Sequence, residues 1–211
     1  MRLYLACTTR SPCGSIPAYV AAGLTQSPST QLRRLWPTQS GQAVHVLKVI
    51  QTADAPPSLV LGTYEGAWEL WHWEPHARGA DVGDWVCDAC VPGAHAAPVT
   101  ALGVLRDAQS LAAMDEALFV TGSSDATLQV WGRTASAAFA PQTISLQGAY
   151  PLDVALVRLP VPTPVVLMAV ALTDRRLMLY TREGHGPFVK QLALEGHEDW
   201  IRALDAVVQP E

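Results

Sequence analysis

Residues 118–131 read LFVTGSSDATLQVW, and this stretch decides the fold class of the chain. Its first four residues are mostly apolar and β-forming, residues 122–126 are turn formers, and residues 127–131 alternate apolar and polar side chains. The stretch therefore predicts two antiparallel strands joined by a tight turn.

Composition limits what the protein can do. The chain has 211 residues, of which 49% are hydrophobic and 16% charged, so a folded domain with a sizeable core is expected. Its net charge of −5 and pI near 5.6 do not provide the basic field of a nucleic-acid binder, and we expect no direct nucleic-acid partner. No apolar run reaches the ~18 residues of a membrane span, and the opening MRLYLACTTR is a poor signal peptide. We therefore expect an intracellular chain with no membrane partner.

Short apolar runs separated by Gly, Pro, Ser and Asp turns recur along the chain, and helical periodicity is nearly absent. This pattern is typical of an all-β fold. Alignment on residues 118–131 gives repeats at roughly 3–36, 44–90, 95–146, 152–194 and 196–207, the last of which stops after its first strand. The third strand of each repeat is expected to end in an aromatic residue, namely Trp36, Trp71, Trp131 or Tyr180. Residues 74–83 are expected to form an inserted loop. The prediction is one repeat domain covering residues 1–211.

Residues 118–131 resemble the middle of a WD40 repeat. In that family a Ser or Thr on the second strand, an Asp in the turn and a Trp on the third strand are hydrogen-bonded in a row to an upstream His. The resemblance implies a structural network of His95, Thr121, Asp125 and Trp131, with His197 in the corresponding turn of the last repeat. It also implies an all-β WD40 β-propeller, here an incomplete arc of about four blades plus the first strand of a fifth.

Residues 188–204, FVKQLALEGHEDWIRAL, resemble the second-subunit family of the Elongator complex, and RLMLY, PQTISLQG and the opening LYLACTTR agree with it. The resemblance implies a non-catalytic scaffold that joins the largest subunit and the catalytic subunit, in the cytoplasm and nucleus. The complex modifies the wobble uridine of certain transfer RNAs. The alternative is a generic WD40 adaptor that recognises proteins or peptides outside Elongator.

A propeller presents its loops at a flat rim, where aromatic and charged residues anchor partners. By their place in the repeat, Ser124, Glu198 and Trp200 are predicted at the top face near the central opening, as candidate partner-binding residues. Trp68, just after a turn, is a further candidate. The alternative for Trp200 is that it caps the core of its blade.

The residues do not suggest catalysis. Cys87 and Cys90 have the spacing of half a zinc site or of a redox pair, but neither a second pair nor a helical pattern follows. We therefore expect small, buried or half-buried residues in a strand, with a zinc module as the alternative. His72, Glu74 and His76 are expected to be solvated in an irregular loop, with a metal site as the alternative. We therefore predict no catalytic residue, no cofactor, no bound metal and no small-molecule substrate.

Overall fold

The computed structural model describes residues 3–8, 42–50, 58–75, 83–105, 118–132, 141–163 and 165–208. These residues form fourteen strands, and the described part of the chain contains no helix. The described residues therefore include no helix that could cross a membrane.

Twelve strands form three four-stranded antiparallel sheets, in each of which every strand pairs with its neighbour in sequence. The strands of the three sheets, which we call blades, are β2 (Val44–Ile50), β3 (Ser58–Thr63), β4 (Trp68–Pro75) and β5 (Gly83–Val91); β6 (Val99–Val104), β7 (Leu118–Ser123), β8 (Thr127–Gly132) and β9 (Gln142–Ser145); and β10 (Pro151–Leu159), β11 (Val165–Leu172), β12 (Leu177–Glu183) and β13 (Val189–Leu194). The remaining two strands, β1 (Leu3–Thr8) and β14 (Ala203–Val208), pair with each other.

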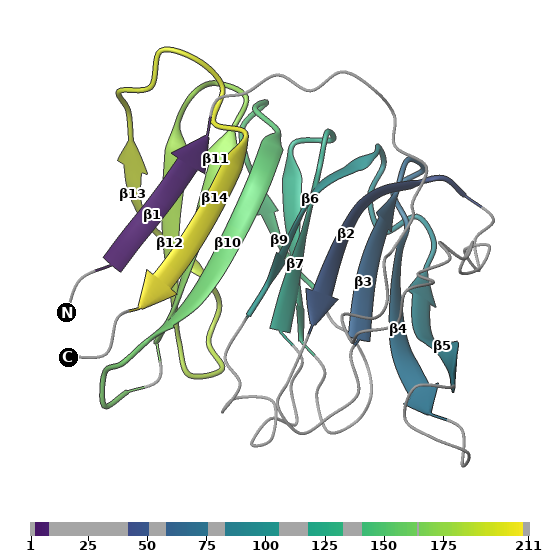
Figure 1. Ribbon diagram of the computed structural model, residues 1–211. Helices are drawn as coiled ribbons and strands as arrows, with labels where there is room; N and C mark the ends of the chain where they lie inside the picture. The colour runs from purple at the N-terminus through teal and green to yellow at the C-terminus, as the bar shows by residue number, and fades with distance from the viewer. Residues whose placement is uncertain are drawn as a thin grey trace, which may run out of the picture.

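The blades stand side by side in sequence order, with the first strand of each on the same side of the molecule (Figure 1). These inner strands adjoin one another: β6 contacts both β2 and β10, and β10 contacts β14. Four-stranded meanders arranged in this way are an arc of a β-propeller. The predicted all-β, partial WD40 propeller is therefore confirmed.

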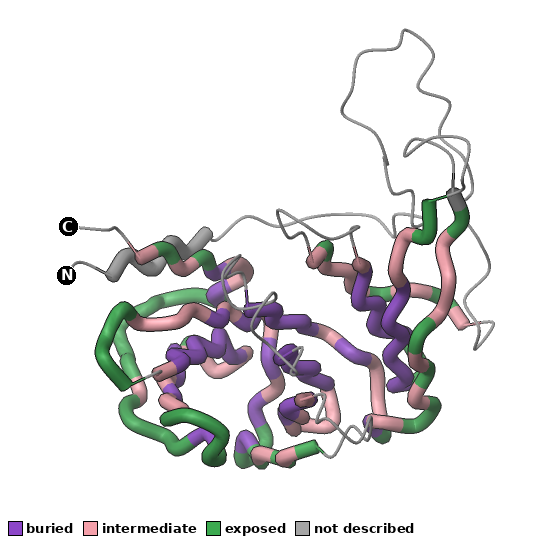
Figure 2. Tube along the Cα trace, turned by 90° about the horizontal axis from the view of Figure 1, so that it is seen from below, coloured by how far each residue is buried: buried purple, intermediate pink, exposed green. Residues whose placement is uncertain are grey.

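The core lies between the blades. One apolar cluster joins the β2–β5 and β6–β9 blades and includes Val60, Trp68, Phe119 and Trp131. A larger one joins the β6–β9 and β10–β13 blades. Figure 2 shows the buried residues gathered between sheets and the exposed ones along the outer strand β13. Apolar strand faces therefore hold the arc together.

Neighbouring blades approach closely at a glycine. A Cβ on Gly122 would lie 2.4 Å from Cγ of Pro151, the first residue of the next inner strand. Gly62 has the same relationship to Val99, where a Cβ would lie 2.5 Å from a methyl carbon. A side chain at either position would push two blades apart, so glycine sets their spacing.

Two details differ from the sequence-based expectation. Residues 3–8 were expected to open a first blade, and the last strand to have no partner, but β1 and β14 form one antiparallel pair. The other two strands expected for the first repeat, within residues 18–36, lie outside the described residues. In addition, β4 extends to Pro75, so His72 and Glu74 lie on a strand and not in a loop. Pairing of β4 with β5 up to Pro75 and Gly83 accounts for the extension.

Candidate functional site

Four residues of the predicted network meet in the β6–β9 blade. The Nε2 atom of His95 lies 2.7 Å from Oγ1 of Thr121, and Nε1 of Trp131 donates a hydrogen bond of 2.9 Å to the same oxygen. On the other side of the ring, Nδ1 of His95 lies 3.3 Å from Oδ2 of Asp125. The side chains thus form one row from the third strand of the blade to its turn.

One arrangement of protons gives every donor and acceptor in this row a partner. Since Thr121 accepts from Trp131, its single hydroxyl proton is available for Nε2 of His95. Nδ1 of His95 then carries the ring proton, which is shared between Oδ2 of Asp125 at 3.3 Å and Oγ1 of Thr127 at 3.1 Å. We therefore assign His95 as the Nδ1–H tautomer, because every polar atom in the row then has a partner.

Asp125 also organises the turn at the end of the row. Its Oδ1 accepts from the backbone N–H of Thr127 at 3.0 Å and from the Thr127 hydroxyl at 2.7 Å. Its Oδ2 accepts from the N–H of Ala96 at 3.0 Å. The carboxylate therefore connects the turn between β7 and β8 to the segment that leads into the blade.

The electrostatics favour a neutral imidazole beside an ionised carboxylate. Burial lowers the pKa of His95, and the nearby Asp125 charge opposes this only in part. Burial raises the pKa of Asp125, but hydrogen bonds from Thr127 and Ala96, together with His95, outweigh it and the pKa is lowered overall. The side chain of His95 is fully buried, whereas that of Asp125 is half-buried. The polar groups of the pair are used in holding the blade, which fits a structural role.

The turns that follow the second strand of each blade have one shape. Gly66, Ala126 and Arg175 occupy the same place in the three turns, and all have positive φ, at 82°, 62° and 70°. Asp174 accepts from the N–H of Arg176 at 3.2 Å, as Asp125 does from Thr127. The β10–β13 blade thus keeps the turn although it lacks the rest of the network.

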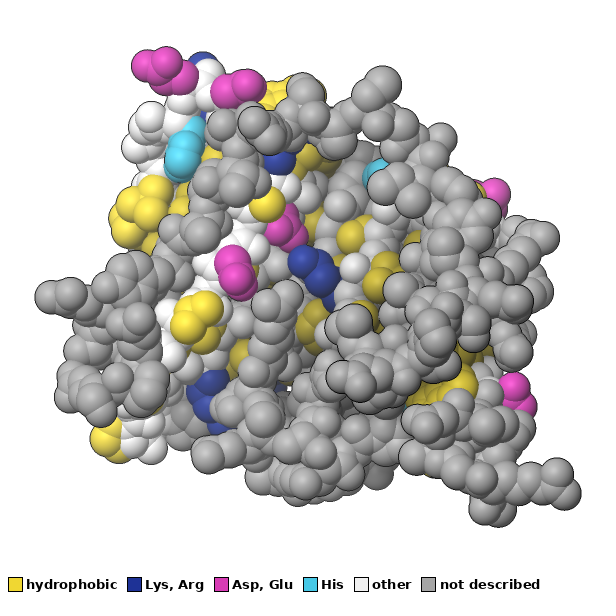
Figure 3. All heavy atoms as spheres, in the orientation of Figure 1, with side chains coloured by type: hydrophobic (Ala, Val, Ile, Leu, Met, Phe, Trp, Pro, Cys, Tyr) yellow, Lys and Arg dark blue, Asp and Glu magenta, His cyan; other side chains and the backbone are white. Residues whose placement is uncertain are grey.

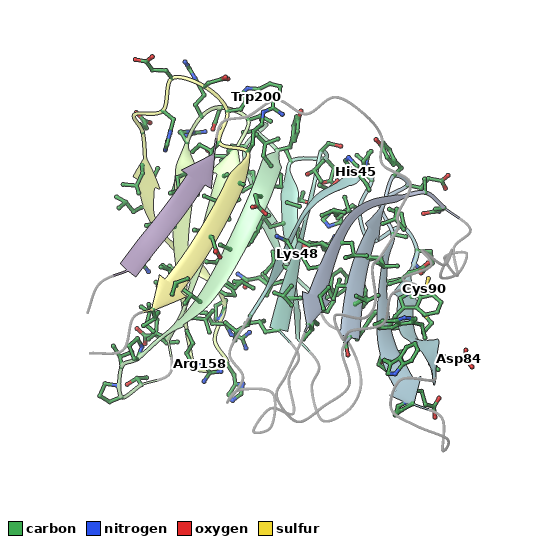
Figure 4. The ribbon with its side chains drawn as sticks, viewed as in Figure 1. His45, Lys48, Asp84, Cys90, Arg158 and Trp200 are labelled. Carbon is green, nitrogen blue, oxygen red and sulfur yellow. The ribbon has the colours of Figure 1, made fainter. Side chains whose placement is uncertain are left out.

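Three of the four predicted rim residues lie at the end of the sheets where these turns gather. Trp200 is 39% exposed in the segment that leads into β14, and Glu198 beside it is exposed. The guanidinium of Arg202 lies 5.1 Å from the centre of the Trp200 ring. Ser124 is half-buried in the turn of the β6–β9 blade. Figure 4 shows Trp200 and His45 at the same end of the molecule.

One candidate does not lie where the sequence suggested. Trp68 is completely buried, with its ring centroid 4.9 Å from those of both Phe119 and Trp131, so it cannot form part of a binding rim. Its place on β4 turns it toward the next blade, which the turn just before it does not reveal. His197 is exposed in the segment that leads into β14, as His95 precedes β6, and its role in a structural network stays a prediction.

Sequence reasoning missed a buried carboxylate in the β2–β5 blade. Glu69 is fully buried, and its Oε2 accepts a hydrogen bond of 2.9 Å from Nε1 of Trp71. Trp71 corresponds to Trp131, so a carboxylate two residues earlier on the same strand provides the acceptor that Thr121 provides in the next blade. The Glu-x-Trp spacing was the available signal, because residues i and i+2 of a strand share a face.

The candidate metal ligands are placed as follows. His72 Nδ1 lies 2.8 Å from Oδ1 of Asp88, while Cys87 and Cys90 are free thiols on β5. His76 lies outside the described residues. Within the described ranges, no group of three or more His, Cys, Asp or Glu side chains has an arrangement that could hold a metal ion.

Comparison with known proteins adds to this geometry. No protein-family model matches the chain. Elongator complex protein 2 of Mus musculus is 30% identical to it over 162 residues, which is 77% of this chain and 18% of that protein. The same protein of Danio rerio is 34% identical over 119 residues, 56% of this chain and 13% of that protein.

This chain is an Elongator subunit 2-like WD40 protein. It spans less than a fifth of the length of the Elongator complex protein 2 sequences quoted above. Among solved structures, the crystal structure of BBS1N in complex with ARL6DN, soaked with lead, matches 75% of this chain and 40% of that chain, at a TM-score of 0.47 and 17% identity. The assignment of the fold rests on the three sheets themselves.

Proposed function

We propose that this chain acts as a non-catalytic scaffold subunit of the Elongator complex, and so supports wobble-uridine modification of transfer RNA by that complex. The observation that carries the proposal is its similarity to Elongator complex protein 2 over 77% of its length. In this proposal the chemistry belongs to the catalytic subunit, and this chain joins that subunit to the largest one, in the cytoplasm and nucleus.

The geometry supports a role in binding proteins. His95 and Asp125 form hydrogen bonds within the β6–β9 blade, and the side chain of His95 is fully buried. Apolar clusters join the blades, and backbone hydrogen bonds close the described turns after β3, β7 and β11, so these turns are held in a defined arrangement that lowers the entropy cost of association. Rigid loops on a rigid framework are suited to joining other proteins.

Trp200 is the residue we expect to contact a partner subunit. Tryptophan and arginine are enriched among the residues that dominate binding energy, and here Arg202 stacks on the Trp200 ring. The next residue, Ile201, is fully buried, which fixes the segment against the β10–β13 blade. Glu198 and Ser124 are the polar candidates beside it.

The test is affinity purification of the tagged chain at native expression, with the recovered proteins identified by mass spectrometry. The proposal expects recovery of the largest and the catalytic Elongator subunits. Trp200→Ala should reduce their yield at least tenfold. Val161→Ala is the matched control, because Val161 is similarly exposed (40%) but lies in the turn at the opposite end of the strands.

Each outcome has a distinct meaning. Recovery of other proteins without Elongator subunits, from a folded chain, would refute the scaffold proposal in favour of the generic adaptor. If both variants recover Elongator equally well, the scaffold proposal stands and Trp200 is not the contact.

A further inference from the structure

The outer strand β5 contains a β-bulge that changes the direction of two cysteines. Its pairing with β4 passes from Leu70 opposite Ala89 to Trp71 opposite Cys87, which leaves Asp88 without a partner position. In a regular strand, residues three apart point to opposite faces. The extra residue brings Cys87 and Cys90 to the same face, opposite Trp71 and Glu69 respectively.

Side-chain contacts agree with this assignment. Cys87 packs in the cluster that contains Trp71, whereas the thiol of Cys90 donates to Oε1 of Glu69 at 4.0 Å. Asp88 instead bonds His72, which lies on the opposite face of β4, and this interaction holds the bulge. Figure 4 shows Cys90 on β5, at the edge of the arc away from β14.

The two thiols are accessible and face one groove. Cys90 is exposed, Cys87 is half-buried, and both line an open groove together with Trp71 and Trp85. Burial raises the pKa of Cys87 to about 11, with the charges of Glu69 and Cys90 adding to the effect. Burial and Glu69 also raise the pKa of Cys90.

The spacing favours a bridging cation over a disulfide. Two residues along a strand span about 7 Å, which is at the upper limit of the Cα separation that a disulfide accepts. One cation held between two thiolates at about 2.3 Å each requires sulfurs about 4.6 Å apart, which side chains on one face can reach. Thiolates select soft ions such as Cu(I).

We propose that Cys87 and Cys90 form a two-thiolate site for a monovalent soft cation of the Cu(I) type. A linear site needs only two sulfur ligands. The described residues contain no group of three or more potential metal ligands, so a two-ligand site is the kind that they can form. On binding, two S–H bonds break, two sulfur–metal bonds form and two protons leave to solvent, with no change of oxidation state. This site is independent of the scaffold role.

The experiment is anaerobic titration of the reduced chain with Cu(I), in competition with a chromophoric Cu(I) chelator. We expect one Cu(I) per chain and an apparent affinity that rises about 100-fold per pH unit near neutrality, because two protons are released. Cys87→Ser and Cys90→Ser should each weaken binding at least 100-fold. The matched control is the double substitution Cys7→Ser, Cys13→Ser, which should bind as the unmodified chain does.

Near-ultraviolet circular dichroism of each variant checks that it is folded. Binding that survives either Cys87→Ser or Cys90→Ser in a folded chain would overturn the proposal, as would loss of binding in the control. The proposal would also be overturned if the purified chain held one zinc ion that Cu(I) could not displace. That result would indicate a closed zinc centre with four ligands.

Discussion

The ammonium of Lys48 on β2 lies 3.6 Å from Oδ1 of Asp153 on β10, although β6 lies between these two inner strands. The other carboxylate oxygen of Asp153 accepts a hydrogen bond of 2.8 Å from the N–H of Leu204, on β14. One side chain therefore ties three inner strands together. Lys48 lies near the middle of the arc in Figure 4, and Figure 3 shows basic and acidic side chains meeting on that face.

Asp153→Ala should destabilise the chain more than Lys48→Met. Removing the carboxylate leaves the N–H of Leu204 without its acceptor, which costs about 1–3 kcal/mol. The partly exposed ion pair alone contributes under about 1 kcal/mol. Urea unfolding of both variants measures the two costs. Equal costs would show that the bond to Leu204 contributes nothing.

Thr121→Val should cost about 1–3 kcal/mol, because it leaves both Nε1 of Trp131 and the ring of His95 without their buried partner. Ser124→Ala is the control: this half-buried residue lies in the turn that follows the same strand, and its substitution should change stability by less than about 0.5 kcal/mol. Thermal or urea unfolding gives both values. If Thr121→Val leaves the free energy of unfolding unchanged, the hydrogen-bonded row from His95 to Trp131 does not stabilise the blade.

Stability should fall between pH 7 and pH 5 because of His95. Its pKa is lowered in the folded chain, so below its ordinary pKa of about 6.5 only the unfolded chain takes up the proton. His95→Gln should be less stable at pH 7 but lose less stability over this interval. Asp125 acts at lower pH, since its folded pKa lies below its ordinary value. Identical pH slopes for the two proteins would refute the assignment of a neutral His95.

Glycine should stabilise two of the three equivalent turns. A residue with a side chain destabilises the folded state by about 1–2 kcal/mol when its backbone is left-handed. Glycine avoids this strain but loses about 0.5–1 kcal/mol more conformational entropy on folding. Ala126→Gly and Arg175→Gly should therefore each raise the free energy of unfolding by up to about 1 kcal/mol. Gly66→Ala should destabilise, because its Cβ would lie 2.2 Å from the carbonyl oxygen of His95. Unfolding midpoints test the signs, and a destabilised Ala126→Gly would contradict the common turn shape.

Gly122→Ala should cost about 1–3 kcal/mol by forcing Pro151 and its blade outward. Gly132→Ala is the matched control, since a Cβ there meets nothing within 4 Å. Adding Pro151→Ala should recover part of the loss. If the two single variants unfold alike, then the blade spacing is not set at Gly122.

The sequence predicted the features that depend on local pattern. Alternation of side chains and the offsets around Asp125 located the strands of the β6–β9 blade and the row from His95 to Trp131. The sequence did not predict the burial of Trp68, because the face on which a strand residue lies depends on how that strand is registered with the strands beside it. Register also determines the bulge at Asp88 and hence the common face of the two cysteines.

The pairing of β1 with β14 could not be predicted from either segment alone, because two short apolar strands carry no information about which strand each will join. That pairing joins Leu3 to Val208, whereas every strand within a blade pairs with its neighbour in sequence. Contacts between distant residues form slowly, since the loop between them must first be closed. We therefore expect each blade to assemble early as an independent meander, and the two terminal strands of the chain, β1 and β14, to pair in the last step of folding.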